Sequence, residues 1–288
     1  MGSRKGLVST AFGDIFLGDC LVHMSTMQGD SVDLVFGSPP YEDARLYLED
    51  GKDLGIALDT EAWVARMIKI VQACLRISKG LVALVVGHGK NGPSDWTAGP
   101  ALLLADLKRQ CVRLRNPAIY KRDGVAGSGG PDWLKANYEW VVCASKKRRL
   151  PWADNTACGH KPKCKPGGVT SQRGKTGERV NKKRVAYKQP DNVNPGLIIN
   201  CPSGGGQMGS NIAHEGEAPF PEKLANFFIR SFCPPGGIVY DPFMDTGTTA
   251  AVAIKTGRKF LGSEIRHSQI KLIRRRVQQA DLQKGFML

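Results

Sequence analysis

The first segment whose residue types could do chemistry is Ser38-Pro39-Pro40-Tyr41, which follows the apolar stretch Val32–Phe36. Two consecutive prolines lack two backbone donors and stiffen the chain, so they leave carbonyl acceptors pointing in a fixed direction. A carbonyl oxygen and the Ser38 hydroxyl could both accept hydrogen bonds from one amino group, and the Tyr41 ring could stack on the heterocycle that carries it. The alternative is a rigid turn with a core tyrosine, which we favour for this tetrapeptide taken alone.

The second such segment is Asp241–Thr249, where a strand should run into a tight turn and then a helix. Gly247 would permit close approach of a ligand, and Thr248 and Thr249 could cap the helix. Seventeen residues after Gly247 comes Glu264, at the end of the next expected strand, where an acid suits the two hydroxyls of a ribose. The alternative is an ordinary turn with a surface glutamate.

Hydrophobic periodicity predicts the elements that must position these residues. The expected strands are 13–18, 32–37, 81–86, 138–144, 237–240 and 259–265, and the expected helices are 61–78, 101–111, 221–233 and 248–256. Strand and helix alternate, which predicts an α/β fold of three layers with a mostly parallel sheet. Ligands of such sheets bind beyond the carboxyl ends of the strands, where both segments are expected.

Positive charge is concentrated in the middle of the chain. The 288 residues carry a formal charge of +15, and Lys146–Gln189 holds fourteen basic residues and two acidic ones. Such an excess is typical of a polyanion-binding segment, because neutralising phosphates releases counterions, although a solvated loop is the alternative. The expected phosphate contacts are Lys146, Lys147, Arg148, Arg149, Lys182, Lys183 and Arg184.

Other features favour a cytoplasmic protein without a metal or a membrane span. No apolar run reaches the roughly 18 residues of a membrane span, and no secretory signal is evident. The eight scattered cysteines do not form a disulfide framework in a chain of this length. Cys158, His160 and Cys164 could be read as zinc ligands, but they lack a paired Cys-x-x-Cys and number only three, so we expect no metal. We expect Arg274–Arg276 to form a solvated helix face.

Together, the two segments resemble motifs of the DNA amino-methyltransferases, which methylate an exocyclic nitrogen of cytosine or adenine. Ser38–Tyr41 resembles the family's catalytic (S/D/N)PP(Y/F/W) motif, and Asp241–Thr249 resembles its cofactor motif, DPFxGxGTT. Gly18-Asp19 resembles a segment that lies near the cofactor, and His214–Lys223 resembles the segment leading into the helix beside the methionine part of the cofactor. The catalytic motif precedes the cofactor motif, with the basic stretch between them, which is the family's β arrangement.

The resemblance covers roughly residues 12–145 and 195–270 and implies a Rossmann-like methyltransferase fold. It implies a catalytic part at 1–145, a loop-rich target-recognition insert at 146–200 and a cofactor-binding part at 201–288. The implied catalytic residues are Ser38, Pro39, Pro40 and Tyr41. The implied S-adenosylmethionine contacts are Asp19, Phe220, Pro221, Asp241, Phe243, Asp245, Gly247, Thr248 and Glu264.

The implied reaction is direct methyl transfer to a base flipped out of double-stranded DNA, without a covalent enzyme intermediate. In the family, Ser before Pro-Pro is more usual for N4-cytosine enzymes, which favours cytosine, and N6 of adenine is the alternative. No nuclease motif is apparent, which favours a stand-alone methyltransferase, as a monomer or a homodimer. The insert is small, roughly 55 residues, which favours a short or relaxed target site.

One residue departs from the family pattern. Asp245 stands where the family's cofactor motif has its first glycine. Aspartate tolerates left-handed geometry better than most residues, so the turn can survive. Its carboxylate could pair with the cofactor's ammonium or repel the cofactor's carboxylate. A catalytically inactive DNA-binding relative is therefore a further alternative.

Overall fold

The computed structural model describes residues 6–42, 48–49, 52–53, 58–87, 96–124, 130–163, 169–183, 190–202, 208–215 and 219–284. The chain divides into two compact units, residues 1–154 with 197–288, and residues 155–196. The insert expected at 146–200 is wider than the second unit, because Lys146–Arg149 belong to the first.

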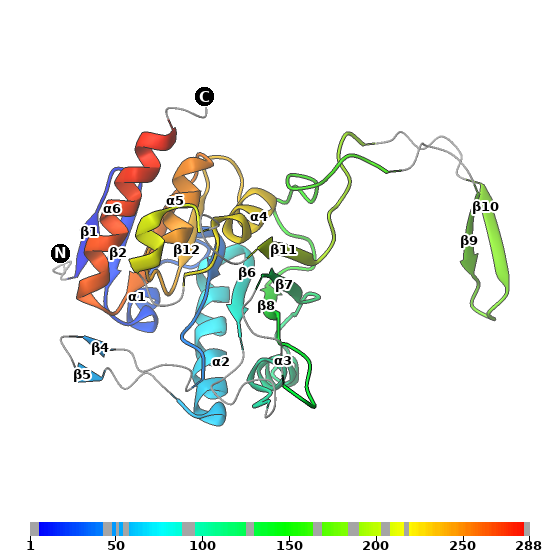
Figure 1. Ribbon diagram of the computed structural model, residues 1–288, viewed down its shortest axis with the longest axis horizontal. Helices are drawn as coiled ribbons and strands as arrows, with labels where there is room; N and C mark the ends of the chain where they lie inside the picture. The colour runs from blue at the N-terminus through cyan, green and yellow to red at the C-terminus, as the bar shows by residue number, and fades with distance from the viewer. Residues whose placement is uncertain are drawn as a thin grey trace. The chain divides into compact units, whose positions relative to one another are not determined.

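Among the described residues, nine strands of the first unit form one sheet in the order β1-β2-β13-β12-β3-β6-β8-β7-β11 (Figure 1). These strands are β1 (Leu7–Ser9), β2 (Gly13–Leu17), β3 (Val32–Gly37), β6 (Ser78–Val86), β7 (Ala118–Asp123), β8 (Tyr138–Ser145), β11 (Ile198–Pro202), β12 (Ile238–Asp241) and β13 (Lys259–Glu264). The strands from β2 to β6 pair in parallel, as do β7 and β11, whereas β1 and β8 run antiparallel to their neighbours. The predicted α/β class and mostly parallel sheet are confirmed.

Helices cover both faces of this sheet (Figure 1). One face carries α1 (Cys20–Thr26), α2 (Thr60–Ile77) and α3 (Gly99–Arg109), and the other carries α4 (Glu222–Phe232), α5 (Thr248–Lys255) and α6 (His267–Lys284). Strand β6 shows how the sequence produces these layers, because successive side chains point to opposite faces. Leu81, Ala83 and Val85 join the core under α4–α6, whereas Leu84 and Val86 join the core under α1–α3.

Four elements of the first unit, α1, α6, β7 and β11, were not predicted. The helix α1 and the strands β7 and β11 are too short for a hydrophobic period to stand out. The longer helix α6 contains many charged residues, and only a narrow stripe of it is buried. None of the described helices is both long and apolar enough to cross a membrane.

The second unit contains a hairpin, which the expectation of an irregular insert did not include. Strand β9 (Val169–Arg173) pairs antiparallel with β10 (Arg179–Lys183). The backbone N–H of Gly174 donates to the Glu178 carbonyl across the turn. Within 42–58, where a loop was expected, the structure describes the short pair β4 (Leu48–Glu49) and β5 (Lys52–Asp53), together with residue 42 and residues from 58 onward.

Candidate active site

The two predicted segments lie side by side at the carboxyl edge of the sheet. They follow β3 and β12, which are parallel neighbours although about 200 residues separate them in the chain. A Cβ atom built on Gly37 would come within 2.2 Å of Asp241 Oδ1 and 3.3 Å of Pro242 Cδ. Glycine at position 37 therefore lets the Asp241 turn approach the backbone that leads into Ser38.

Hydrogen bonds fix the Ser38-Pro39-Pro40-Tyr41 segment. The Ser38 hydroxyl lies 3.2 Å from both the Val85 carbonyl oxygen and Tyr41 Oη, and can donate to either. The Trp63 indole N–H donates to the Pro40 carbonyl over 2.8 Å. This leaves the Pro39 carbonyl, rather than that of Pro40, as the backbone acceptor that suits the expected role.

Two residues that the sequence did not single out hold Tyr41. Its hydroxyl donates to Glu139 Oε2 over 2.8 Å, and Arg122 Nη1 lies 3.0 Å from Glu139 Oε1. Burial, together with the Glu139 carboxylate, raises the pKa of Tyr41 well above its usual value, so its hydroxyl stays protonated as a donor. An acid within the otherwise apolar strand β8 is the sequence signal that could have pointed to Glu139.

Asp241 begins the turn that is expected to hold the cofactor. It is buried, and its Oδ1 accepts a hydrogen bond from the Phe243 backbone N–H over 2.9 Å. Its Oδ2 has no hydrogen-bond partner among the described residues. Burial raises the pKa of this carboxyl to about 7. A buried carboxylate oxygen that lacks a donor fits a cationic ligand such as the ammonium group of S-adenosylmethionine.

The residues after Asp241 form a left-handed turn into α5. Asp245 and Gly247 have φ of 43° and 78°, a region that glycine adopts freely and aspartate tolerates. Gly247 is the N-cap of α5, and no side chain caps the helix, so the expected capping by Thr248 and Thr249 is wrong. The Thr248 hydroxyl instead accepts a hydrogen bond from α6.

The Asp245 carboxylate has a partner within the protein. Its Oδ1 lies 3.0 Å from Arg266 Nη2, a partner that the sequence analysis did not consider. The Asp245 backbone N–H donates to Glu264 Oε2 over 2.8 Å. Glu264 is only 6% exposed, so the alternative of a surface glutamate is wrong, and burial raises its pKa to about 7.

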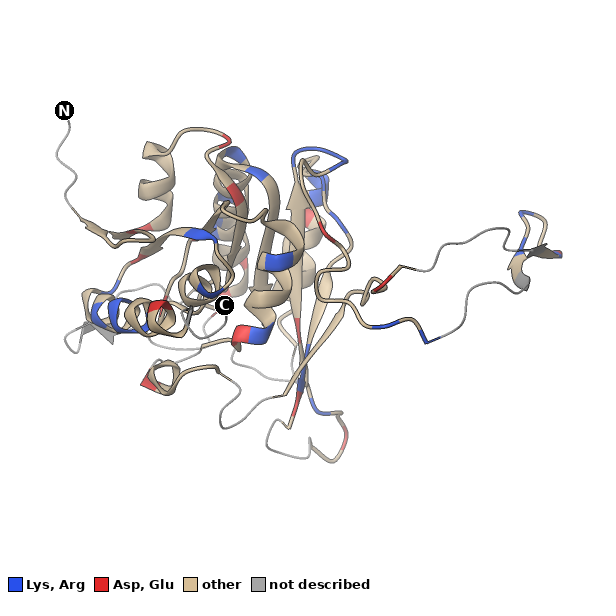
Figure 2. Ribbon diagram, turned by 90° about the horizontal axis from the view of Figure 1, so that it is seen from above, with Lys and Arg blue, Asp and Glu red and all other residues tan. Residues whose placement is uncertain are grey.

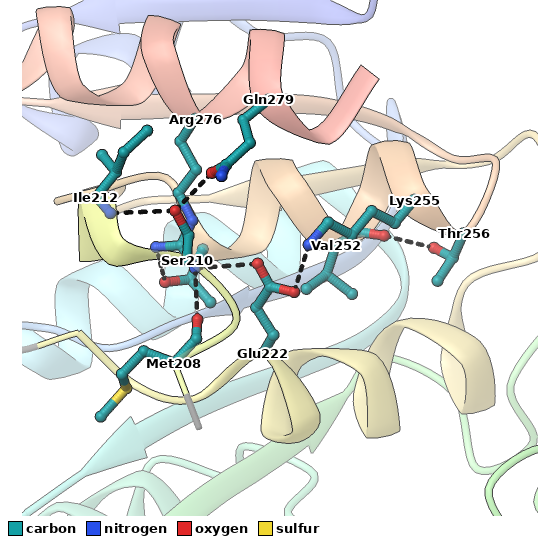
Figure 3. Close-up of polar contacts among 10 residues, drawn as sticks. Met208, Ser210, Ile212, Glu222, Val252, Lys255, Thr256, Arg276 and Gln279 are labelled. Atoms are coloured by element: carbon teal, nitrogen blue, oxygen red, sulfur yellow. Dashed lines mark hydrogen bonds and ion pairs between the residues drawn. The ribbon is translucent and has the colours of Figure 1, made fainter. Parts of the chain in front are cut away.

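Arg276 connects this turn to two other segments (Figure 3). It is 1% exposed, so the prediction that Arg274–Arg276 form a solvated face is wrong for this residue, although Arg275 is exposed. Its Nη1 donates to the hydroxyls of Thr246 and Thr248 over 3.1 and 2.9 Å. Its Nη2 donates to the Met208 carbonyl and to Glu222 Oε1 over 3.0 and 3.2 Å.

The remaining expected cofactor residues lie around the same edge. The Gly18 N–H donates to the Glu264 carbonyl over 2.8 Å, which brings Asp19 to the end of β13. The Asp19 carboxylate caps α1 at the Leu21 N–H and lies 2.6 Å from Arg66 Nη2. A further group lies near α4 and the turn: Pro221 is the N-cap of α4, Phe220 packs edge-on against Phe36, and Phe243 packs against the core under α1–α3.

The expected DNA contacts are not gathered at this edge. Ser145 pairs with Leu81 near the start of β6, whereas Trp140 pairs with Val86 at its end, beside Ser38. Lys146–Arg149 therefore follow β8 at the sheet edge opposite Ser38, and Lys146 pairs with Asp30 there.

Lys182 and Lys183 lie in β10 of the second unit, and Arg184 lies outside the described residues. Residues 155–196 contain ten basic and two acidic residues, and Figure 2 shows the charges along the chain. Phosphate contact by these residues stays a prediction.

A metal site is not visible in the part of the chain that the structure describes. Within that part, no group of three or more His, Cys, Asp or Glu residues could hold a metal ion. Cys158 and His160 belong to the second unit, and Cys164 falls outside the described residues.

Comparison with known proteins decides the family. The model of the N6/N4 DNA methylases matches residues 32–275, most of the chain. The chain belongs to this family. It is thus an enzyme that transfers a methyl group from S-adenosylmethionine to an exocyclic amino group in DNA.

Similar proteins of known sequence are methyltransferases over nearly their whole length. The orphan methyltransferase M.BamHII of Bacillus amyloliquefaciens is 29% identical over 86% of this chain and 86% of its own. The DNA adenine methyltransferase YhdJ of Escherichia coli K12 is 28% identical over 95% of this chain and 87% of its own.

Solved structures confirm the fold. PvuII DNA methyltransferase, cytosine-N4-specific, superposes with a TM-score of 0.67 at 17% identity, covering 96% of this chain and 93% of its own. The DNA modification methylase TTHA0409 of Thermus thermophilus, solved with S-adenosyl-L-methionine, gives a TM-score of 0.57 at 22% identity, covering 92% and 93%.

Proposed function

We propose that this methyltransferase modifies N4 of cytosine in double-stranded DNA. The observation that carries the proposal is the contact between the two segments, in which Gly37 lets Asp241 lie directly beside Ser38. A substrate amino group held by Ser38 would thus lie next to a cofactor held by the Asp241 turn. A serine at position 38, rather than an aspartate, is the feature that favours cytosine.

Ser38 and Pro39 would hold the substrate amino group. The Ser38 hydroxyl and the Pro39 carbonyl would accept its two N–H bonds and turn the nitrogen lone pair toward the cofactor. S-adenosylmethionine supplies an electrophilic methyl group on its sulfonium. Aligning the two reactants in this way accounts for much of the expected rate enhancement.

Tyr41, Glu139 and Arg122 would keep the Ser38 hydroxyl in the accepting orientation. Ser38 can donate its own proton to Tyr41 Oη, which in turn donates to Glu139 Oε2. The oxygen lone pairs of Ser38 then remain for the substrate. The same hydrogen-bond chain leads from the amino nitrogen, which loses a proton on methylation, to a carboxylate that can accept one. Because Glu139 fixes the Tyr41 hydroxyl, it also orients the ring that we expect to stack on the base.

The target base must leave the duplex to reach this edge of the sheet, at a cost of a few kcal/mol. We assign target recognition to the second unit, on the basis of its positive charge. Because the substrate is DNA, we expect the enzyme to work in the cytoplasm.

N6 of adenine is the second candidate, because YhdJ, 28% identical over 95% of this chain, is described as a DNA adenine methyltransferase. An inactive relative is less well supported than either, because Asp245, the residue that suggested it, is paired with Arg266.

The test is to incubate the purified protein with unmethylated duplex DNA and isotope-labelled S-adenosylmethionine, and to digest the product to nucleosides for mass spectrometry. We expect label in N4-methylcytosine. Label in N6-methyladenine alone would replace the base assignment by the second candidate. No labelled nucleoside, with DNA binding retained, would favour an inactive relative.

A further inference from the structure

Three charged side chains are packed together at the carboxyl ends of β12 and β13. Arg266 lies between two acids, with Nη2 3.0 Å from Asp245 Oδ1 and Nε 3.6 Å from Glu264 Oε1. The Arg266 and Glu264 side chains are 5% and 6% exposed, whereas that of Asp245 is 27% exposed. Asp245 is therefore the member of the group that faces the open side of the turn.

Glu264 connects the backbones of the two other residues. Its Oε2 accepts the Asp245 N–H over 2.8 Å, and its Oε1 accepts the Arg266 N–H over 2.9 Å. The left-handed turn at Asp245 and the start of α6 are thereby joined to one carboxylate. Glu264 still has lone pairs for further donors, because a carboxylate offers about four acceptor sites.

The charge of the group depends on Arg266. Asp241, Asp245 and Glu264 lie at this edge, and the charge of Asp245 contributes to raising the pKa of both other carboxyls. Arg266 is the cation that contacts both Asp245 and Glu264. Without it, the Asp245 carboxylate would be an uncompensated negative charge beside the site where the carboxylate of the cofactor must also be accommodated.

We propose that Arg266 is a positioning residue for the cofactor: its guanidinium neutralises and holds the Asp245 carboxylate, so that an acid is compatible with cofactor binding at a position where the family has glycine. The inference rests on the proposed cofactor site. It concerns a pair of residues in this chain, Asp245 and Arg266, rather than the family's motif.

The proposal is tested by the affinity of the full-length protein for S-adenosylmethionine, measured by isothermal titration calorimetry without DNA. The variants are Arg266→Met, Asp245→Asn and the double substitution. We expect Arg266→Met to weaken binding at least tenfold. In the Asp245→Asn background the same substitution should change the affinity less than threefold, because no carboxylate is left to neutralise.

Two further variants make the result interpretable. Arg275→Met removes an arginine of α6 that is 53% exposed and pairs with Glu215, so it should bind the cofactor like the wild type. If Arg266→Met does not fold, as judged by thermal unfolding without cofactor, Arg266→Gln retains hydrogen-bond donors while removing the charge. The same loss and the same rescue are expected of it.

Equal weakening by the Arg266 substitution in both backgrounds would overturn the proposal and leave Arg266 a purely structural residue. No weakening in the Asp245 background would also overturn it. A wild-type protein that binds no S-adenosylmethionine would refute the cofactor site itself. That failure is distinguishable because it is seen before any substitution is made.

Discussion

At the scale of single residues, the sequence predicted those site residues that are contiguous in the chain. Ser38–Tyr41 and Asp241–Gly247 each form one turn, so their order alone shows that they act together. Glu139 could not be predicted in the same way, because its partner Tyr41 is 98 residues away. The pairing of Arg266 with Asp245 likewise depends on the register of β12 and β13.

Ser38→Ala tests the role of the hydroxyl. We expect the substitution to lower the single-turnover rate of methyl transfer by about 100- to 1000-fold, the usual effect of removing one hydrogen bond that stabilises the transition state. The affinity for S-adenosylmethionine should change less than threefold. Rapid-quench measurement with labelled cofactor gives the rate, and Ser25→Ala, in which an exposed serine of α1 is removed, is the control. An unchanged rate would refute the proposed role of Ser38.

The buried Asp241 carboxyl predicts a pH dependence of stability. Its pKa is raised to about 7 in the folded protein, so the folded state binds this proton more tightly than the unfolded state does. Its contribution to stability is therefore full below the unfolded pKa and is lost as the pH rises to about 7. Relative to Asp241→Asn, the wild type should lose about 2–3 kcal/mol of unfolding free energy between pH 5 and pH 8.

Urea denaturation without cofactor at several pH values measures this difference. Asp106→Asn is the matched control, because Asp106 is paired with Arg109 at the surface of α3. The difference between the wild type and this control should not vary with pH. A constant difference for Asp241→Asn as well would show that Asp241 is ionised throughout this range.

At the scale of elements, α6 is where prediction from sequence failed most clearly. Arg274–Arg276 suggested a solvated face, because three consecutive charges do not show which of them points inward. The buried stripe of the helix contains Ile273 and Val277, and Arg276 is also buried, one turn after Ile273. Helical periodicity applied to the charged residues would have placed Arg276 at the edge of this stripe.

Arg276→Met should destabilise the first unit by about 3–5 kcal/mol, because it leaves buried partners, Glu222 among them, without their cation. Urea denaturation measures this loss. The exposed neighbour Arg274 provides the control, and Arg274→Met should change stability by less than about 0.5 kcal/mol. Similar effects of the two substitutions would contradict the assignment of Arg276 as a buried connection between α6 and the cofactor turn.

The β9–β10 hairpin predicts where DNA affinity resides. Replacing Lys182 and Lys183 together by alanine should weaken DNA binding and reduce the slope of log K against log salt by about 2, one for each phosphate that is no longer neutralised. Fluorescence anisotropy across a salt series measures the slope. The paired substitution of Lys146 and Lys147, at the sheet edge opposite Ser38, is the comparison. An unchanged slope in the hairpin variant would remove Lys182 and Lys183 from the expected DNA contacts.

At the scale of the whole molecule, alternation of strands and helices was enough to predict the class, the layers and the parallel centre of the sheet. The outer strands β7 and β11 were missed, because each is short and partly exposed. The sequence also could not show that Lys146–Arg149 belong to the first unit, because a continuous basic stretch does not reveal where one unit ends. Strand order, which depends on long-range pairing, decides which residues reach the active edge.

The measurement that tests the central claim most directly is single-molecule sequencing of genomic DNA from a bacterial strain without methyltransferases of its own that expresses this protein. The account predicts N4-methylcytosine in a short sequence motif, and its absence when Ser38→Ala is expressed instead. N6-methyladenine without N4-methylcytosine, or modification that persists in the Ser38→Ala strain, would contradict it.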